Sequence, residues 1–179
     1  MSNFKFHTME TAPEATQKLF ENSLSNFGMI PNLHAVLGDE PPVLEAYQLM
    51  HKLFQETCLD AEELTVVWQT INVEHNCGYC VPAHSMIADM MKVDPAINKA
   101  LREGSALPNE KLQVLHDTTL LILRNRGQLT EEQLAPFFAA GYGQKHILAI
   151  LLGLSQKVIS NYINHLAKTP VDEAFAHYA

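Results

Sequence analysis

The sequence has little positive charge, no basic patch and no long apolar run. Its 12 Lys and Arg residues stand against 20 Asp and Glu, which gives a formal net charge of -8. Proteins that bind nucleic acid need clustered basic side chains, so nucleic acid is not an expected partner. The longest apolar run, residues 147–154, is far too short to span a bilayer, and the N-terminus lacks the apolar stretch of a signal peptide. We therefore expect a cytoplasmic protein with no membrane partner.

The sequence also lacks the glycine-rich signatures of flavin and nicotinamide sites, so we expect no cofactor. No segment alternates with a period of two for long enough to predict a strand, and no repeat or linker divides the chain. Helical periodicity dominates, which predicts an all-α fold, a single-domain helical bundle over residues 1–179. The expected helices cover approximately residues 12–27, 32–37, 41–57, 60–75, 79–91, 94–103, 109–126, 130–140, 144–167 and 171–177.

Two of the three cysteines lie close together, in a segment whose pattern favours redox chemistry. Cys77 and Cys80 form a Cys-x-x-Cys pair, with Glu74 before it and His84 after it. Such a pair can cycle between dithiol and disulfide, and a nearby base lowers the pKa of a thiol toward the reactive thiolate. The segment therefore holds an attacking sulfur, a resolving sulfur and a pair of groups for proton transfer.

Spacing places these groups on one face of a helix. The separations of three and four residues from Cys77 to Cys80 and from Cys80 to His84 are those of helical neighbours. Pro82 is tolerated only in a first helical turn, so we expect a break at about residues 76–78 and a new helix after it. Cys80 would then lie near a helix N-terminus, whose dipole favours a thiolate. Glu74 would end the preceding helix and fold back toward the pair.

Other roles for the cysteines remain open at this point. Zinc could be held by Cys77, Cys80, His84 and Glu74, although zinc sites usually draw on two paired clusters. Attached haem requires a histidine directly after the second cysteine, and a thioredoxin motif requires a βαβ context; both are missing. A pair of buried structural cysteines is the plainest alternative. Cys58 is expected to be a small buried hydrophobe.

The pattern Glu74-x-x-Cys77-x-Tyr79-Cys80-x-x-x-His84 resembles the alkylhydroperoxidase D-like branch of the carboxymuconolactone decarboxylase superfamily. Residues 27–33, 44–47 and 160–165 also look like family segments. The resemblance implies an all-helical, oligomeric protein, usually a trimer or hexamer, with peroxidase activity. It implies that Cys80 attacks the peroxide, that Cys77 resolves, and that Glu74 and His84 relay protons.

One departure from the family concerns the relay acid. Some members place it a full helix-length before the first cysteine, at the position of Thr65 in this chain. Lactone decarboxylation is disfavoured, since the decarboxylases generally lack the cysteine pair.

Further polar residues could line a pocket around the cysteines. Tyr79 lies inside the motif and His75 follows Glu74 directly. Asn161, Tyr162, Asn164 and His165 interrupt an otherwise apolar helix, so they face either an oligomer partner or the cysteine pocket. We include Tyr79, His75, His165 and Asn161 as possible pocket residues.

The sequence thus predicts a thiol peroxidase for a small hydroperoxide, hydrogen peroxide or organic, that depends on an external thiol or dithiol reductant. A protein disulfide exchanger or redox sensor would use the same pair, and a structural zinc module is the alternative outside enzymes. Three helical segments carry apolar residues on more than one face, which predicts a homo-oligomer. These segments are residues 43–54, 114–123 and 147–163.

Overall fold

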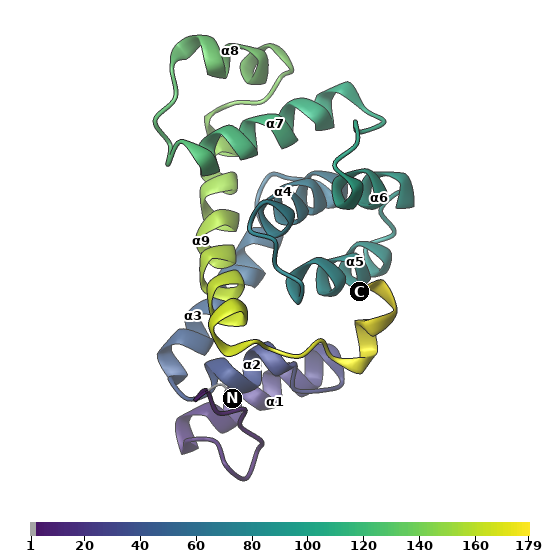
Figure 1. The fold of residues 1–179 in the computed structure, drawn as a ribbon. Coiled ribbons are helices and arrows are strands. Elements are labelled where there is room, and N and C mark those ends of the chain that lie inside the picture. The colour runs from purple at the N-terminus through teal and green to yellow at the C-terminus, as the bar shows by residue number, and fades with distance from the viewer. Residues whose placement is uncertain (1–2) are drawn as a thin grey trace.

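The computed structural model describes residues 3–179, and this part of the chain is helical with no strand (Figure 1). Met1 and Ser2, part of the segment judged for a signal peptide, lie outside the described residues. The elements are α1 (Glu14–Phe27), α2 (Asn32–Leu37), α3 (Pro41–Gln55), α4 (Ala61–Glu74), α5 (Cys80–Met90), α6 (Pro95–Glu103), α7 (Glu110–Arg124), α8 (Glu131–Ala139), α9 (Gln144–Ala167) and the 3₁₀ helix η1 (Glu173–Tyr178). The predicted all-α fold is confirmed; the tail helix is 3₁₀ rather than α.

Local capping chemistry sets the helix boundaries. Asp60 accepts a hydrogen bond from the backbone N–H of Glu63, whose side chain accepts one from the N–H of Asp60 in return. This capping box satisfies donors that would otherwise be orphaned at the start of α4. Asn109 caps α7 through its side-chain oxygen. Gly28 ends α1 at a φ of 71°, a conformation that glycine adopts without a Cβ penalty.

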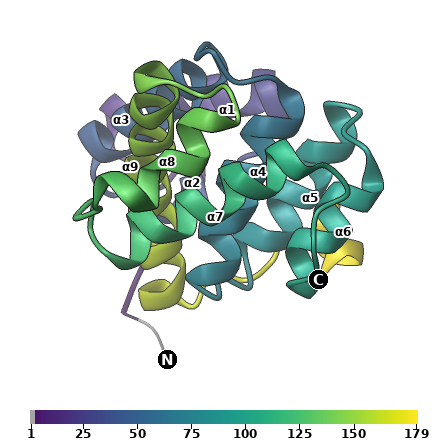
Figure 2. The same cartoon turned by 90° about the horizontal axis from the view of Figure 1, so that it is seen from above.

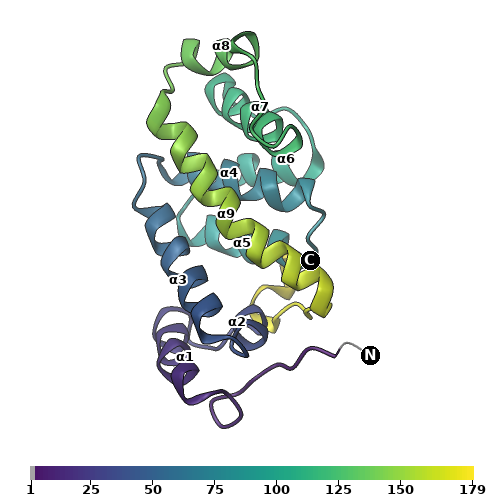
Figure 3. The same cartoon turned by 90° about the vertical axis from the view of Figure 1, so that its left-hand side faces the viewer.

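Helices α4 and α9 form the centre of the bundle. Helix α4 contacts α5, α6, α7 and α9, while α3 runs against α9 (Figures 1 and 3). Seen from above in Figure 2, α7 and α8 lie over α4 and α9. Gly153 of α9 allows the close approach of α3, since a Cβ there would lie 2.8 Å from the ring of Phe54. The long helix α9 is therefore held against both α3 and α4.

Helix α9 is long and apolar enough to cross a membrane by length and composition alone. Its buried residues include polar ones, such as Lys157 and Asn164, that face the interior of the bundle. Its contacts with α3 and α4 make it a core helix of this fold.

A separate cluster of buried residues surrounds Cys77 and Cys80. Cys77 and Cys80 pack with Leu44 and Tyr47 of α3 and with Phe175 of η1. Segments far apart in the sequence therefore contribute to one cluster around the cysteines, and η1 lies against α5.

Cys58 is exposed, so the expectation that it is buried was wrong. It lies in the loop between α3 and α4, where the neighbouring Leu59 takes the buried position instead.

Candidate functional site

A tight backbone turn presents the cysteine pair. Helix α4 ends at Glu74, and Asn76 then adopts a φ of 52°, in the left-handed region that asparagine tolerates better than most residues. The N–H of Cys77 donates to the carbonyl of Asn72 at 3.0 Å, which closes the end of α4. Helix α5 begins at Cys80. The predicted break at residues 76–78 and the placement of Cys80 at a helix N-terminus are confirmed.

The two thiols differ in what they face. Both are free, with Cys77 0% and Cys80 1% exposed. Cys77 Sγ accepts a hydrogen bond from the N–H of Cys80 at 3.4 Å, and Cys80 Sγ accepts one from Asn164 Nδ2 at 3.3 Å. Cys80 lines a cavity, whereas Cys77 is absent from its walls. The geometry therefore makes Cys80 the sulfur that a small molecule can reach.

Lys157 of α9 is the cation of the site. Its side chain is 0% exposed, and its Nζ lies 2.8 Å from His84 Nε2. Burial lowers the pKa of the Lys157 ammonium, and the negative charge of the neighbouring Cys80 opposes part of that lowering. A buried ammonium is costly without an anion beside it, and the Cys80 thiolate is that anion.

The surroundings lower the pKa of the Cys80 thiol and raise the pKa of the Cys77 thiol. Burial disfavours the Cys80 thiolate, but hydrogen bonding with Cys77, the charge of Lys157 and contacts with Ser160 and Asn164 outweigh it and lower the Cys80 pKa to about 5. The Cys77 pKa is raised, first by its hydrogen bond with Cys80 and then by burial and the neighbouring negative charge. At neutral pH the site therefore holds one thiolate, Cys80, and one thiol, Cys77.

His84 is neutral at this site. Burial, followed by the charge of Lys157, lowers the His84 pKa well below its ordinary value. Because an ammonium has no acceptor, His84 Nε2 accepts from Lys157, which places the ring proton on Nδ1. No side chain among residues 3–179 bonds to that Nδ1. His84 lines the cavity and packs against Trp68 at 4.8 Å between ring centroids.

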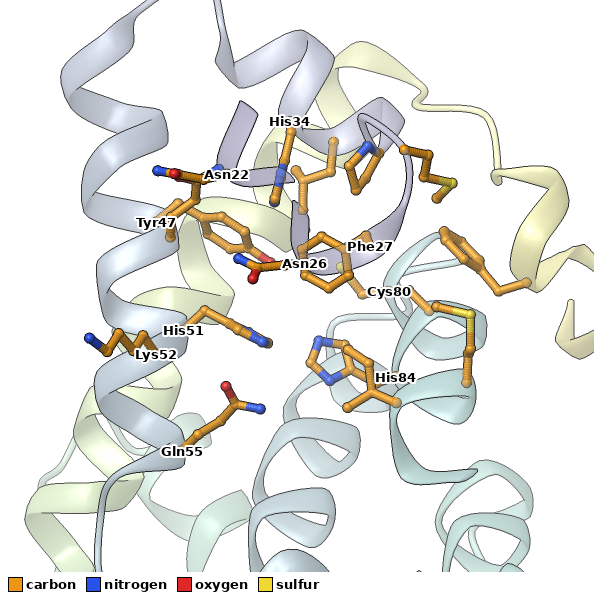
Figure 4. Close-up of a pocket in the computed structure, with 18 of the residues that line it drawn as sticks. Asn22, Asn26, Phe27, His34, Tyr47, His51, Lys52, Gln55, Cys80 and His84 are labelled. Carbon is orange, nitrogen blue, oxygen red and sulfur yellow. The ribbon is translucent and has the colours of Figure 1, made fainter. Parts of the chain in front are cut away.

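The cavity above Cys80 has a volume of about 860 Å³. Figure 4 shows α3 supplying Tyr47, His51, Lys52 and Gln55 on one side, with Cys80 and His84 opposite. Methionine and aromatic side chains make up much of the remaining wall. These are Met29, Met86, Met90, Met91, Phe27 and Phe175.

Two further histidines face the same cavity and are also neutral. Burial and then the charge of Lys157 lower the His51 pKa to about 4, and burial lowers the His34 pKa to about 3. His51 Nδ1 accepts from Gln156, which in turn accepts from the indole N–H of Trp68. The cavity thus has mostly apolar and neutral polar walls, with Glu45 and Lys52 as charged residues in its lining.

Of the four possible pocket residues predicted from the sequence, the structure places one, Tyr79, in the cavity lining. Tyr79 lines the cavity and its hydroxyl donates to Asp172 at 2.5 Å. His75 and Asn161 are hydrogen-bonded to each other at 2.8 Å. Asn161 also donates to the side chain of Asn72, which in turn donates to the backbone carbonyl of Cys80. His165 is exposed on the surface of α9, away from the cavity lining.

Glu74 does not fold back toward the cysteines. Its carboxylate accepts two hydrogen bonds of 2.7 Å from the Arg124 guanidinium, which lowers the Glu74 pKa. Glu74 is the last residue of α4, so its side chain is directed toward α7 rather than toward α5. The structure thus brings Cys77, Cys80 and His84 together and leaves Glu74 outside, with Lys157 as the charged partner of His84.

The four residues considered as zinc ligands are not together in the structure, because Glu74 is held by Arg124. Within residues 3–179 no three His, Cys, Asp or Glu side chains are placed to hold a metal ion.

Lys157, Ser160 and Asn164 were not predicted as site residues, although their spacing carried a signal. They recur every three or four residues and are buried in the most apolar helix. Buried polar groups need partners, and a stripe of them on one helical face marks the partner surface. Asn164 had been singled out among residues facing either a pocket or a partner, and the structure places it at Cys80.

No protein-family model and no curated protein matches the sequence. Solved structures do share its fold. An uncharacterized peroxidase-related protein from Ralstonia eutropha JMP134, described as an alkylhydroperoxidase AhpD core, has a TM-score of 0.85 at 16% identity, over 97% of this chain and 94% of that chain. A peroxidase-related protein from Silicibacter sp. TM1040 has a TM-score of 0.80 at 20% identity, over 97% and 92% of the two chains.

A third similar structure is a cysteine-to-alanine variant of the debrominase Bmp8 in complex with 2,3,4-tribromopyrrole. Its TM-score is 0.78 at 17% identity, over 99% of this chain and 96% of that chain. The fold is therefore that of the alkylhydroperoxidase AhpD core, as the motif's resemblance predicted, and it is shared by proteins described as peroxidase-related and by a debrominase.

Proposed function

We propose that this protein is a thiol-dependent peroxidase that reduces hydroperoxides through a dithiol–disulfide cycle of Cys80 and Cys77. The observation that carries the proposal is the asymmetry of the pair. Cys80 lines a cavity and its pKa is lowered, whereas Cys77, three residues earlier, lies outside that lining and its pKa is raised. Only a thiolate attacks peroxide efficiently, and a resolving thiol must be adjacent to the sulfenic acid that results.

The chemistry balances in two steps at the cysteines. The Cys80 thiolate attacks the terminal oxygen of the hydroperoxide, an S–O bond forms, the O–O bond breaks, and the alkoxide that leaves takes a proton to become an alcohol. Cys77 then attacks the sulfur of the Cys80 sulfenic acid. The S–S bond forms, the S–O bond breaks, and the departing hydroxide takes the Cys77 proton to become water. An external thiol or dithiol returns two electrons and restores both thiols.

Burial favours a small substrate over a protein partner. A disulfide exchanger must bring a partner's sulfur to an exposed cysteine, whereas Cys80 is 1% and Cys77 0% exposed. The cavity gives a small molecule access to Cys80 alone. This favours the peroxidase over the disulfide exchanger or redox sensor.

The cavity also favours an organic hydroperoxide over hydrogen peroxide. A volume of about 860 Å³ lies within the range typical of pockets for drug-sized ligands, and much of its wall is apolar. Burial of an apolar group of phenyl size stabilises binding by about 1.5–3 kcal/mol. We expect kcat/KM for cumene hydroperoxide to exceed that for hydrogen peroxide by about tenfold or more, measured with dithiothreitol as reductant. Loss of two thiols per chain after one equivalent of hydroperoxide is expected in the same preparation.

A cavity-narrowing variant supplies the control. Ala83 lines the cavity, and Ala83→Phe should lower the rate with cumene hydroperoxide while it preserves the rate with hydrogen peroxide. Equal rates for the two peroxides in both proteins would contradict the assignment of an organic substrate. Failure of the wild type to consume either peroxide would contradict the peroxidase itself.

Glu74 is expected to be dispensable for peroxide reduction. Its carboxylate is held by Arg124, outside the cavity lining. Glu74→Gln should therefore leave kcat/KM for cumene hydroperoxide within about twofold of wild type, as is usual for a surface change. Arg124→Gln is the matched control and should behave alike. A tenfold loss in Glu74→Gln alone would restore Glu74 to the proton relay.

We further propose that the protein is a cytoplasmic homo-oligomer, with trimer or hexamer favoured. Large apolar side chains on two of the predicted segments remain exposed in the single chain, as expected of surfaces that a second copy of the chain covers. They are Val43, Leu49 and Leu53 of α3, and Leu148, Leu151 and Tyr162 of α9.

A further inference from the structure

Lys157 and His84 form a hydrogen-bonded pair in the protein interior, and His84 is one of the residues that line the cavity. Lys157 is fully buried and donates to His84 Nε2 at 2.8 Å. The opposite ring nitrogen, Nδ1, therefore carries a proton and has no partner among residues 3–179. A buried donor without a partner is costly, and such groups recur where a ligand completes the hydrogen bond. His84 lines the cavity next to Cys80.

We propose that Lys157 supplies, through His84, the proton that the leaving alkoxide takes up when Cys80 cleaves the O–O bond. This inference rests on the proposed peroxidase function and assigns the proton source within it. His84 is the group that touches the substrate, and Lys157 acts through His84.

The transfer balances without any added reagent. As the S–O bond forms and the O–O bond breaks, the alkoxide takes the proton from His84 Nδ1, and His84 Nε2 takes a proton from Lys157 Nζ. His84 stays neutral throughout, and Lys157 becomes a neutral amine. Reduction of the later disulfide brings two protons: one restores the Cys77 thiol and the other goes to His84 Nδ1, while His84 Nε2 gives its proton back to Lys157. Cys80 is then a thiolate again, and the ion pair and the starting tautomer of His84 are both restored.

The charge on Cys80 determines when Lys157 gives up this proton. Before attack, the Cys80 thiolate stabilises the buried ammonium, and burial opposes it. After attack the sulfur is neutral, so the ammonium has lost its counter-ion in a water-poor site. The proton is therefore held while Cys80 is a thiolate and is released when the alkoxide appears. The other polar groups near the pair, His51 and the amide of Asn164, are uncharged.

Peroxides with different leaving groups test this assignment. Tert-butyl hydroperoxide releases a strongly basic alkoxide that needs a proton, whereas peracetic acid releases acetate, which does not. Single-turnover rate constants for Cys80 oxidation are measured with each, following the fluorescence of Trp68, the one tryptophan of the sequence. Both peroxides react with the same thiolate, so the ratio of the two rate constants is independent of the thiolate fraction.

Three variants separate proton supply from charge. Lys157→Met removes both the proton source and the positive charge. His84→Leu removes the imidazole that passes the proton on, but keeps the Lys157 ammonium. Lys157→Arg keeps a positive charge that cannot give up its proton. In each, the ratio of the peracetic acid rate to the tert-butyl hydroperoxide rate should rise about 10²-fold over wild type, the usual scale of general-acid catalysis. Lys111→Met removes a lysine outside the cavity lining and should leave the ratio unchanged.

An unchanged ratio in Lys157→Met and His84→Leu, with both peroxides slowed alike, would overturn the inference. If Lys157→Met does not fold, the ratio in His84→Leu decides alone. A wild type that reacts with neither peroxide would instead contradict the proposed function, so the two failures are distinguishable.

Discussion

Replacement of Cys80 by serine should lower peroxide turnover by at least about 10³-fold, because a serine hydroxyl is not ionised near neutral pH and the nucleophile is lost. Cys77→Ser should behave differently. It keeps the Cys80 thiolate and should consume about one equivalent of hydroperoxide in a rapid first turnover, then stall as a sulfenic acid that cannot be resolved internally. Stopped-flow and steady-state assays on the two variants measure the contrast.

Cys58→Ser is the matched control, since Cys58 is exposed in a loop between α3 and α4 and should contribute nothing to turnover. Retention of turnover in Cys80→Ser, or equal loss of the first turnover in both Cys77→Ser and Cys80→Ser, would contradict the assigned roles.

Lys157→Met should shift the pH dependence of the reaction to higher pH. In the wild type the Cys80 pKa is lowered to about 5, so the thiolate is present above that pH and is lost as pH falls through it. The rate should therefore rise through about pH 5 and stay level up to neutrality. In Lys157→Met the hydrogen bonds with Cys77, Ser160 and Asn164 remain, but the ammonium no longer helps to offset burial, so the Cys80 pKa should rise. At pH 7 the rate should then fall by about tenfold for each unit by which the Cys80 pKa comes to exceed 7.

The measurement is alkylation of Cys80 by iodoacetamide against pH, in a Cys58→Ser background with the modified residue identified by mass spectrometry. Lys157→Arg should keep the midpoint low, because it retains the charge. His84→Leu should change the midpoint little, since neutral His84 gives no positive charge to Cys80. An identical midpoint in wild type and Lys157→Met would show that Lys157 does not set the charge of Cys80.

Most of the fold could be read from the sequence because its helix signals are local. The capping box at Asp60 and Glu63 and the break before Cys80 each depend on a few neighbouring residues. For the same reason the spacing of Cys77, Cys80 and His84 gave the core of the site. Helical periodicity alone could not show that Cys58 would be exposed, because burial in a loop depends on what packs over it.

The charged partner of the site could not be predicted, because it comes from a helix some 70 residues away in the sequence. His84 and Lys157 are 73 residues apart and meet only where α9 packs against the cysteine helix. The sequence motif indicated the nearest acid, Glu74, as the proton relay. In the structure Glu74 instead forms a salt bridge with Arg124, a residue of another helix. Proximity in sequence is a poor guide to the partner of a buried histidine, since the tertiary contacts decide it.

The most direct test of the peroxidase proposal is to identify the sulfur that peroxide oxidises. Reduced Cys77→Ser protein is treated with one equivalent of cumene hydroperoxide in the presence of dimedone, which traps sulfenic acids, and the labelled peptide is found by mass spectrometry. We predict one dimedone adduct per chain, on Cys80. An adduct on Cys58, or no adduct while Cys80 remains a free thiol, would contradict the assignment of Cys80 as the peroxide-reducing thiolate.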